Sequence, residues 1–279
     1  MKRVCLPDGQ RVPALGQGTW RMGESKRARK EEIAALRLGI ELGMTLIDTA
    51  EMYGDGGAEE LVGEAVAGQR EHVFVVTKVY PHNASAAKLP RACERSLKRL
   101  RTSVVDLYLL HWREKTPPLT ETVEAFEQLR AAGKIRHWGV SNFNLADMQE
   151  LLEIENGGAC ATNQVLYNLE NRQIEFDLLR WSEEKKIPIM AYAPVGHGRG
   201  LLDNPTLEEI AGRHQASPAQ IALAWLLRCQ NVIAIPKAAD PAHVRENAAS
   251  VDIKLSDEDL ALIDQQFPPP RSKHPLRML

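Results

Sequence analysis

Two hydrophobic patterns alternate between residues 30 and 250, and this alternation constrains the fold more than any other feature of the chain. Short apolar runs, many of them β-branched, are each followed by a longer amphipathic stretch. This order is typical of parallel strands joined by crossover helices. It predicts eight strands, at residues 14–18, 45–48, 73–78, 104–111, 135–141, 159–164, 188–193 and 232–235.

Helices are expected in the gaps between these strands. The amphipathic stretches predict them at residues 31–43, 58–67, 86–100, 121–132, 145–154, 178–186 and 218–229, with a short additional helix at 207–214. Ser217-Pro218 and Asp240-Pro241 each place a capping residue before a proline at the first helical position. The acidic run that begins at Ser256 suits another helix N-terminus. Extra helices are therefore expected near the C-terminus.

Eight strands alternating with helices in 279 residues predict one closed (β/α)8 barrel, an α/β fold in a single domain spanning residues 1–279. An open, doubly wound sheet is the alternative. That fold needs a phosphate-binding glycine fingerprint in its first βα turn, and this chain lacks one. Asp8-Gly9 between two short apolar segments predicts an N-terminal β-hairpin, which we expect to plug one end of the barrel.

Charge and cysteine usage exclude several classes of partner. The formal net charge of −2 provides no general attraction to nucleic acid or to an anionic membrane. No apolar run approaches the roughly 18–20 residues that span a bilayer, and the N-terminal residues lack a signal-peptide core. The four cysteines are scattered without a C-x-x-C pair, which argues against a disulfide framework and a zinc site. We expect a cytoplasmic protein, a monomer, with no metal.

Polar residues end nearly every predicted strand. In a parallel barrel the carboxyl ends of all strands converge on one site, and a buried polar group without a partner costs about 1–3 kcal/mol. The concentration of such groups at one end therefore predicts an active site. The residues at these strand ends, and in the turn that follows the second strand, are Gly18, Thr19, Trp20, Asp48, Tyr53, Lys78, His111, Trp112, Ser141, Asn142, Gln164, Tyr192 and Lys237.

This set of groups suits the reduction of a carbonyl. It contains no second ligand at metal-binding distance from His111 and no serine or cysteine nucleophile paired with a base. A free phenol has a pKa of about 10, and a nearby lysine cation lowers it by stabilising the phenolate. The set can therefore protonate a developing alkoxide, whereas the hydride must come from a cofactor.

Several segments, in this order along the chain, resemble the aldo-keto reductase family. They are residues 16–20 (GQGTW), 46–54 (LIDTAEMYG), 109–112 (LLHW), 139–143 (GVSNF), 163–164 (NQ), 235–238 (IPKA) and 246–247 (EN). The resemblance covers essentially the whole chain. It is strongest to the bacterial branch that reduces small aldehydes and methylglyoxal.

The resemblance implies four catalytic residues. Tyr53 would be the general acid and Lys78 the partner that lowers its pKa. Asp48 would pair with Lys78, and His111 would orient the substrate carbonyl.

The resemblance also implies a nicotinamide site. Ser141, Asn142 and Gln164 would hold the carboxamide, and Tyr192 would stack on the ring. Lys237 would meet the adenosine 2′-phosphate, which favours NADPH. The remaining cofactor contacts would come from Gly18, Thr19, Pro194, Val195, Gly196, Ala238, His243, Glu246 and Asn247. Family members that prefer NADPH often carry serine and arginine where this chain has Ala238 and His243, so NADH use is also open.

Loop lengths indicate the kind of substrate. The segment after His111 and the C-terminal tail from Phe267 are short, which predicts an open, shallow site for small, reactive carbonyl compounds. Its rim is expected to consist of Trp20, Met22, Tyr80 and Trp112. The loop at residues 196–200, GHGRG, has the wrong spacing for a Rossmann or P-loop motif and is expected to close over cofactor.

Each site residue alone has an ordinary structural explanation. Asp48 could cap a turn, Lys78 could be a solvated charge, and His111 could be a satisfied core histidine. Their joint occurrence at successive strand ends favours the active site. Two other functions stay open, namely a nicotinamide-binding regulatory subunit with little turnover and a barrel hydrolase or isomerase that uses no nicotinamide.

Overall fold

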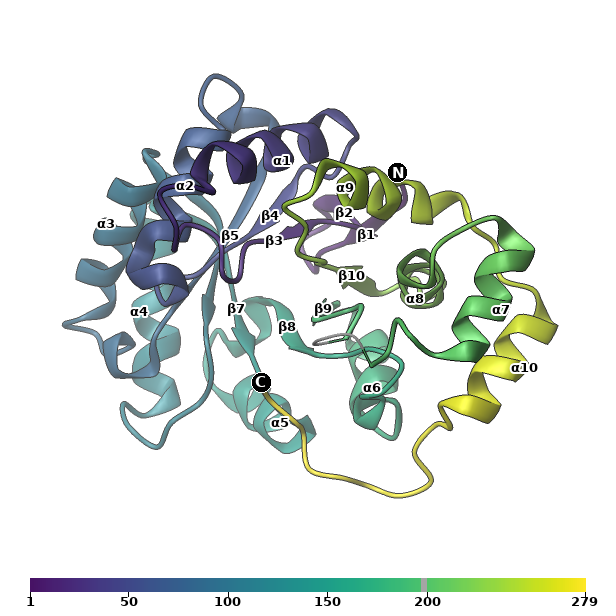
Figure 1. The fold of residues 1–279 in the computed structure, drawn as a ribbon. Coiled ribbons are helices and arrows are strands. Elements are labelled where there is room, and N and C mark those ends of the chain that lie inside the picture. Colours follow the sequence, from purple (N-terminus) through teal and green to yellow (C-terminus); the bar gives the residue numbers. More distant parts are fainter. Residues whose placement is uncertain (197–199) are drawn as a thin grey trace.

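Eight parallel strands form the barrel in the computed structural model, which describes residues 1–196 and 200–279 (Figure 1). They are hydrogen-bonded in chain order, and Leu15 bridges to Ala234 in parallel to close the sheet. The Gly18 N–H also donates to the Pro236 carbonyl at 2.9 Å. The strands are β3 (Gln17–Gly18), β4 (Leu46–Asp48), β5 (Phe74–Val79), β6 (Val105–Leu110), β7 (Ile135–Ser141), β8 (Cys160–Leu166), β9 (Ile189–Tyr192) and β10 (Val232–Ala234). The closed barrel is confirmed.

Helices surround the strands as an outer ring (Figure 1). In α3 the apolar residues Leu89, Ala92, Leu97 and Leu100 are buried against the barrel, and the helix ends where Arg101 adopts a left-handed φ of 53°. The ten α-helices in the described parts of the chain are α1 (Arg29–Glu41), α2 (Gly57–Ala65), α3 (Leu89–Leu100), α4 (Leu119–Ala131), α5 (Leu145–Glu153), α6 (Leu178–Lys185), α7 (Pro205–His214), α8 (Pro218–Leu227), α9 (Pro241–Ala249) and α10 (Asp257–Gln266). Each predicted helix is present, with ends that differ from the prediction by at most three residues.

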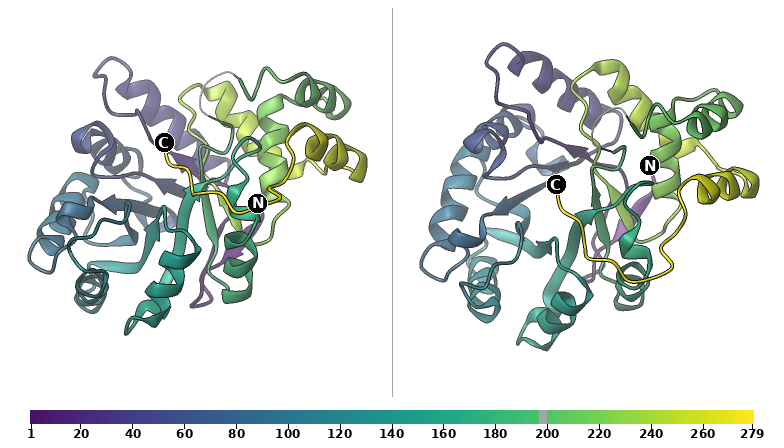
Figure 2. Two further views of the ribbon diagram at one scale, coloured as in Figure 1. Left: turned by 90° about the horizontal axis from the view of Figure 1, so that it is seen from below. Right: turned by 60° about the horizontal axis from the view of Figure 1, so that its bottom comes forward.

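An N-terminal hairpin covers the end of the barrel at which the strands begin. It pairs β1 (Arg3–Cys5) with β2 (Arg11–Pro13) in antiparallel register. Val4, Leu6 and Val12 are at most 2% exposed and belong to the main hydrophobic core. In Figure 2 the hairpin and the C-terminus lie at opposite ends of the barrel. The predicted plug is confirmed.

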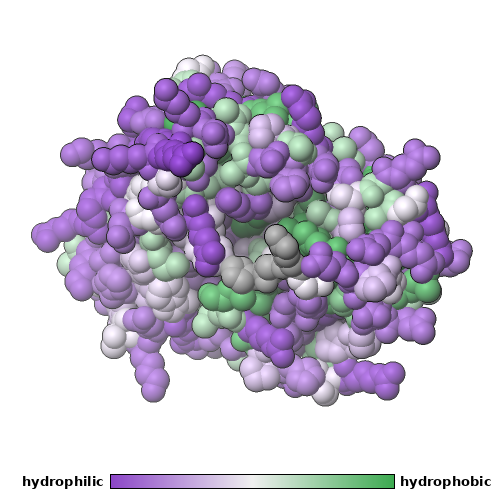
Figure 3. Space-filling model, viewed as in Figure 1, coloured by the Kyte–Doolittle hydropathy of each residue, from purple (hydrophilic) through white to green (hydrophobic). Residues whose placement is uncertain are grey.

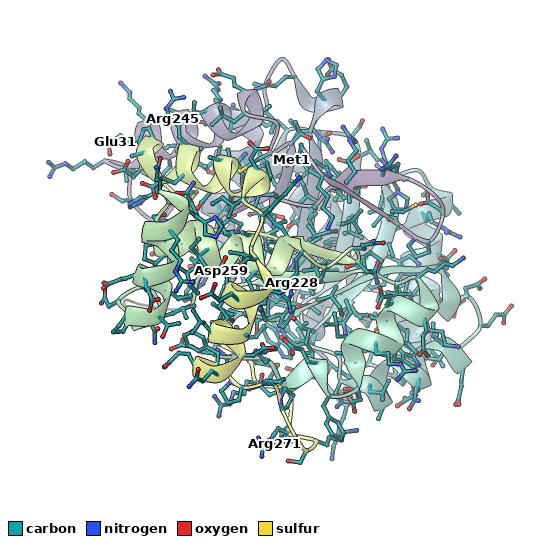
Figure 4. The ribbon with its side chains drawn as sticks, turned by 90° about the vertical axis from the view of Figure 1, so that its right-hand side faces the viewer. Met1, Glu31, Arg228, Arg245, Asp259 and Arg271 are labelled. Atoms are coloured by element: carbon teal, nitrogen blue, oxygen red, sulfur yellow. The ribbon has the colours of Figure 1, made fainter. Side chains whose placement is uncertain are left out.

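Helix caps account for the extra C-terminal helices. Ser217 and Ser256 each form a capping box at the start of α8 and α10, and Asp240 caps α9. Asp259, labelled in Figure 4, also binds the ring of His214 at 2.8 Å, which ties α10 to α7. Burial alone would raise the pKa of Asp259, but hydrogen bonds from His214 and Ser256 lower it to about 2.

The C-terminal tail crosses to the other end of the barrel from the hairpin. From α10 it passes α6 and α5 and ends near the centre of the barrel mouth (Figures 1 and 2). Arg172 anchors its beginning by donating hydrogen bonds to Asp264 and to the Phe267 carbonyl. Lys273 pairs with Asp177 at 3.1 Å. No helix among the described residues is both long and apolar enough to cross a membrane.

Candidate active site

Four polar residues from three neighbouring strands and one turn meet at the carboxyl end of the barrel. Asp48 ends β4, Lys78 lies in β5, and His111 follows β6. The Lys78 Nζ donates to Asp48 Oδ2 at 2.8 Å, to the Thr49 carbonyl at 2.8 Å and to the Tyr53 hydroxyl at 3.2 Å. The rings of Tyr53 and His111 lie edge to face, with centroids 5.9 Å apart. The structure thus brings together the four residues that the sequence predicts to be catalytic.

A strained turn places Tyr53 over Lys78. It is the 3₁₀ turn Tyr53–Gly56, in which Gly54, Asp55 and Gly56 have φ values of 56°, 51° and 92°. Glycine is the residue that adopts such values without steric cost. A Cβ at Gly56 would also lie 2.5 Å from Cδ of Arg99, whose guanidinium is held by the buried carboxylate of Glu59. The two glycines explain how the chain reverses directly after Tyr53.

Lys78 and Asp48 form an ion pair that is almost fully removed from water, with side chains 0% and 3% exposed. Burial acts to lower the pKa of Lys78, but the charge of Asp48 and the bonds to Asp48 and Tyr53 outweigh it and raise the pKa. Burial raises the pKa of Asp48, and Lys78 and the Gln164 amide offset this only in part. Lys78 is therefore a cation at neutral pH.

The net shift in the pKa of the Tyr53 hydroxyl differs from the prediction made from the sequence. Burial raises the pKa of its hydroxyl, Lys78 opposes this increase, and the negative charge of Asp48 adds to it. Lys78 acts in the expected direction, but the expected net lowering of the pKa is not found. The hydroxyl of Tyr53 consequently carries its proton at neutral pH, which is the form a proton donor needs.

His111 is neutral in this environment. Burial, with a smaller contribution from the Lys78 cation, lowers the pKa of its imidazole to about 3. Its Nδ1 is a buried atom without a hydrogen-bond partner among the described residues. A neutral imidazole carries one N–H, so it can donate one hydrogen bond to a carbonyl oxygen without bearing a positive charge.

These residues line a cavity of about 570 Å³ at the mouth of the barrel. Figure 3 shows a hollow in the centre of this face with hydrophobic residues at its border. The predicted residues in its wall are Gly18, Thr19, Trp20, Asp48, Tyr53, His111, Trp112, Ser141, Asn142, Gln164, Tyr192, Pro194, Val195, Gly196 and Lys237. Lys78 lies directly beneath this wall, within hydrogen-bond distance of Asp48 and Tyr53.

One side of the cavity is a network of amide and hydroxyl groups. Gln164 Nε2 donates to Asp48 Oδ1 at 2.7 Å, and the Ser141 hydroxyl donates to the Gln164 carbonyl at 2.8 Å. The Tyr192 hydroxyl donates to Asn142 Oδ1 at 3.0 Å. Burial raises the pKa of Tyr192 to about 12, so its hydroxyl remains protonated. The network links the predicted carboxamide-binding residues directly to the Lys78–Asp48 pair.

Some predicted residues lie outside the cavity wall. Met22 is fully buried in the hydrophobic core, so its prediction as a rim residue is wrong. Tyr80 does not line the cavity and packs behind Trp112, with ring centroids 5.7 Å apart. Both errors concern side-chain direction just beyond a strand, where the alternation of the strand no longer applies.

The residues predicted to bind the adenosine part of the cofactor follow β10, and four of them also lie outside the cavity wall. They are Ala238, His243, Glu246 and Asn247. His243 is exposed and Asn247 is buried, while Glu246 accepts a hydrogen bond from Ser217 at 3.1 Å. The expected closing loop at 196–200 falls largely on residues 197–199, which lie outside the described residues.

Six residues of the cavity wall were not predicted from the sequence. The additional lining residues are Arg21, Met52, Ala193, Ile235, Met278 and Leu279. Arg21, Met52 and Ala193 adjoin predicted residues, and Ile235 is the last residue of the predicted strand 232–235. Met278 and Leu279 come from the tail, whose shortness predicts an open site. The tail instead contributes apolar side chains to the mouth, and no local sequence signal indicates this long-range contact.

The order of strands, the buried ion pair and the phenol above it now allow a comparison with known proteins. The profile of the "Aldo/keto reductase family" matches residues 14–266. The chain belongs to the aldo/keto reductase family. As a family member it is an oxidoreductase, which confirms the resemblance seen in the motifs.

Relatives of this aldo/keto reductase cover almost its whole length. It is 56% identical over 272 residues to "Methylglyoxal reductase YeaE" of Escherichia coli (strain K12), which covers 96% of this chain and 95% of that protein. It is 33% identical over 270 residues to "Methylglyoxal reductase DkgA" of Salmonella typhimurium, over 93% of this chain and 91% of that protein. A crystal structure of an aldo/keto reductase from Klebsiella pneumoniae in complex with NADP and acetate superposes with a TM-score of 0.97 at 51% identity, covering 100% of this chain and 99% of that one.

Proposed function

We propose that this aldo/keto reductase uses NADPH to reduce small aldehydes and ketoaldehydes, methylglyoxal among them, and that Tyr53 donates the proton. The observation that carries the proposal is the contact of the Tyr53 hydroxyl with Lys78 Nζ at 3.2 Å, above a buried Lys78–Asp48 pair. The named methylglyoxal reductases among its relatives support the substrate class.

The residues present fit a nicotinamide cofactor. The hydroxyl and amide groups of Ser141, Asn142 and Gln164 form one hydrogen-bonded side of the cavity, and the exposed side chain of Lys237 also lines it. Ser141, Asn142 and Gln164 would hold the carboxamide, Tyr192 would lie against the ring, and Lys237 would bind a phosphate. The cofactor would supply the hydride, which no side chain can provide.

Side chains of this protein can supply the proton that the reduced carbonyl oxygen needs. Tyr53 keeps its proton at neutral pH because burial raises the pKa of its hydroxyl. It can transfer that proton to a carbonyl oxygen that gains negative charge, and the Lys78 cation stabilises the phenolate that remains. Neutral His111 lies beside Tyr53 and can donate a hydrogen bond to the same oxygen. Asp48 keeps Lys78 in place.

The apolar mouth suits a small carbonyl compound. Trp20, Met52, Trp112, Met278 and Leu279 contribute to the cavity wall. Lys237 favours NADPH over NADH, whereas Ala238 offers no side-chain donor to a 2′-phosphate. A single domain, a monomeric state and a cytoplasmic location remain predictions from the sequence.

Turnover tests this function against the regulatory-subunit alternative. The assay follows loss of NADPH absorbance at 340 nm with methylglyoxal, and repeats it with NADH and with a benzaldehyde. We expect many turnovers per enzyme molecule with NADPH and fewer with NADH. Tight binding of NADPH without turnover on either aldehyde would contradict the proposal and favour the regulatory function.

A further inference from the structure

The buried carboxylate of Glu51 joins the turn that carries Tyr53 to the loop that follows β5. Glu51 lies two residues before Tyr53, is 8% exposed, and donates its backbone N–H to the Lys78 carbonyl at 3.2 Å. Its Oε1 accepts hydrogen bonds from the Tyr80 backbone N–H at 2.8 Å and from Asn83 Nδ2 at 3.1 Å. One side chain therefore fixes the start of the loop after β5 relative to the turn that carries Tyr53.

The loop that Glu51 holds supports an aromatic wall. The ring of Tyr80 stacks on His82, with centroids 4.8 Å apart, and meets Trp112 edge-on at 5.7 Å. Its centroid is 6.5 Å from that of His111. Trp112 and His111 line the cavity, whereas Tyr80 contacts their rings without being a lining residue. A shift of Tyr80 would therefore be transmitted to the side chains that face the substrate.

We propose that Glu51 is a positioning residue for substrate binding, which acts by holding Tyr80 against Trp112. This inference rests on the proposed reductase function, because it concerns the affinity of that same cavity for aldehyde. Glu51 does not line the cavity and contacts no reacting atom. Its loss should weaken aldehyde binding while the Tyr53–Lys78–Asp48 contacts and the amide network around Gln164 remain in place.

Glu51 should position Tyr80 mainly as a hydrogen-bond acceptor, and its negative charge should matter less. Both bonds to the loop end on Oε1. The other oxygen, Oε2, is 3.7 Å from Arg95, whose side chain is 51% exposed, and an ion pair of this kind contributes little. Glutamine at position 51 keeps an acceptor oxygen and nearly the same shape. Glu51→Gln should therefore preserve most of the affinity for aldehyde.

The test compares Glu51→Ala and Glu51→Gln in steady-state kinetics with methylglyoxal. Glu51→Ala leaves the partly buried Tyr80 N–H without its carboxylate acceptor and should raise KM for the aldehyde about tenfold. We expect kcat and the Kd for NADPH to stay within about twofold, and Glu51→Gln to restore most of the lost affinity. Hydrogen exchange of the segment 80–84 should be faster in Glu51→Ala and close to wild type in Glu51→Gln.

Glu121→Ala is the matched control. Glu121, on α4, also binds the connection between β5 and α3, since its Oε1 accepts a hydrogen bond from the Ala86 backbone N–H at 2.9 Å. It forms no hydrogen bond or ion pair with Tyr80, Asn83 or Trp112 among the described residues. Its removal should leave KM for the aldehyde unchanged.

Tyr80→Leu keeps the inference testable if Glu51→Ala folds poorly, because this single change removes the ring that packs against Trp112 and should itself raise KM for the aldehyde. Where Glu51→Ala folds, adding it to Tyr80→Leu should produce much less than the sum of the separate effects. Additive effects, an unchanged KM in Glu51→Ala, or an equal loss in NADPH affinity would overturn the inference. Absence of wild-type turnover would instead refute the proposed function, and the hydrogen-exchange result would still decide whether Glu51 holds the loop.

Discussion

The two ends of the barrel bury opposite kinds of side chain. The hairpin closes one end with Val4, Leu6 and Val12, which are apolar and at most 2% exposed. The other end buries Lys78 and Asp48 to the same degree, although both carry charge. The same depth of burial therefore has opposite energetic consequences at the two ends.

The apolar end of the barrel contributes to the stability of the fold, whereas the charged end serves catalysis. Each apolar side chain of the hairpin contributes about 1.5–3 kcal/mol when it is fully buried. A buried ion pair contributes little net stability, because removing both charges from water offsets their attraction. The ion pair instead holds the Lys78 Nζ 3.2 Å from the hydroxyl of Tyr53 at the cavity. The following predictions test whether the two ends can be altered independently.

Removal of the cation at the catalytic end should have the largest effect. Lys78→Met leaves the Asp48 carboxylate buried without its partner, so we expect the free energy of unfolding at pH 7 to fall by about 3–5 kcal/mol. Aldehyde reduction should fall about thousandfold, because the phenolate of Tyr53 loses its stabilising charge. Chemical denaturation and the 340 nm assay measure the two effects.

The double variant Asp48→Asn with Lys78→Met is the control. It removes both charges and should recover much of the stability but none of the activity. Recovery of activity together with stability would show that the ion pair has only a structural role.

A cavity at the hairpin end should affect stability alone. Leu6→Ala removes fully buried apolar volume and should lower the free energy of unfolding by about 2–4 kcal/mol. We expect kcat and KM for methylglyoxal to stay within about twofold below the unfolding transition. A large loss of kcat in the folded protein would show that the two ends are coupled.

Loss of the exposed cation at the rim should change cofactor preference. Lys237→Ala should raise KM for NADPH about tenfold, which corresponds to roughly 1.4 kcal/mol. KM for NADH should change by less than about twofold, because NADH has no 2′-phosphate. Equal effects on both cofactors would remove Lys237 from the phosphate site.

The neutral state of His111 predicts a loss of stability on the acid side. The pKa of its imidazole is about 3 in the folded protein and about 6.5 when unfolded. As the pH falls from 6.5 towards 3, only the unfolded state gains this proton, so His111 destabilises the fold in that range. His111→Gln should reduce the acid-side loss of stability.

The activity of the wild type should show no titration of His111 between pH 5 and 8. This follows because its imidazole stays neutral across that range. An inflection of kcat/KM near pH 6.5 that disappears in His111→Gln would contradict the account.

The sequence was sufficient to predict the barrel and the groups at its carboxyl end. Strand periodicity and chain order place Asp48, Lys78, His111 and Gln164 at one end of the sheet, since parallel strands share a direction. The hairpin was predictable because Asp8-Gly9 is a local turn signal. These features depend on local patterns and on connectivity, both of which a single sequence contains.

Features that depend on side-chain direction or on distant contacts could not be predicted. Met22 and Tyr80 lie beyond regular structure, so no periodicity indicates whether they face the cavity. Met278 reaches the mouth only because the tail follows a long extended path, and the sequence between Phe267 and Leu276 specifies no such destination. The net pKa of Tyr53 depends on the balance between burial and Lys78, which requires coordinates.

Tyr53→Phe tests the central claim most directly. This variant removes one oxygen, keeps the ring over Lys78, and leaves the Lys78–Asp48 pair and the hairpin end unchanged. NADPH consumption with methylglyoxal at 340 nm should fall at least about thousandfold, while the Kd for NADPH and the unfolding midpoint stay near wild type. Retention of most of the activity would show that another group donates the proton, and the account of the catalytic end would be wrong.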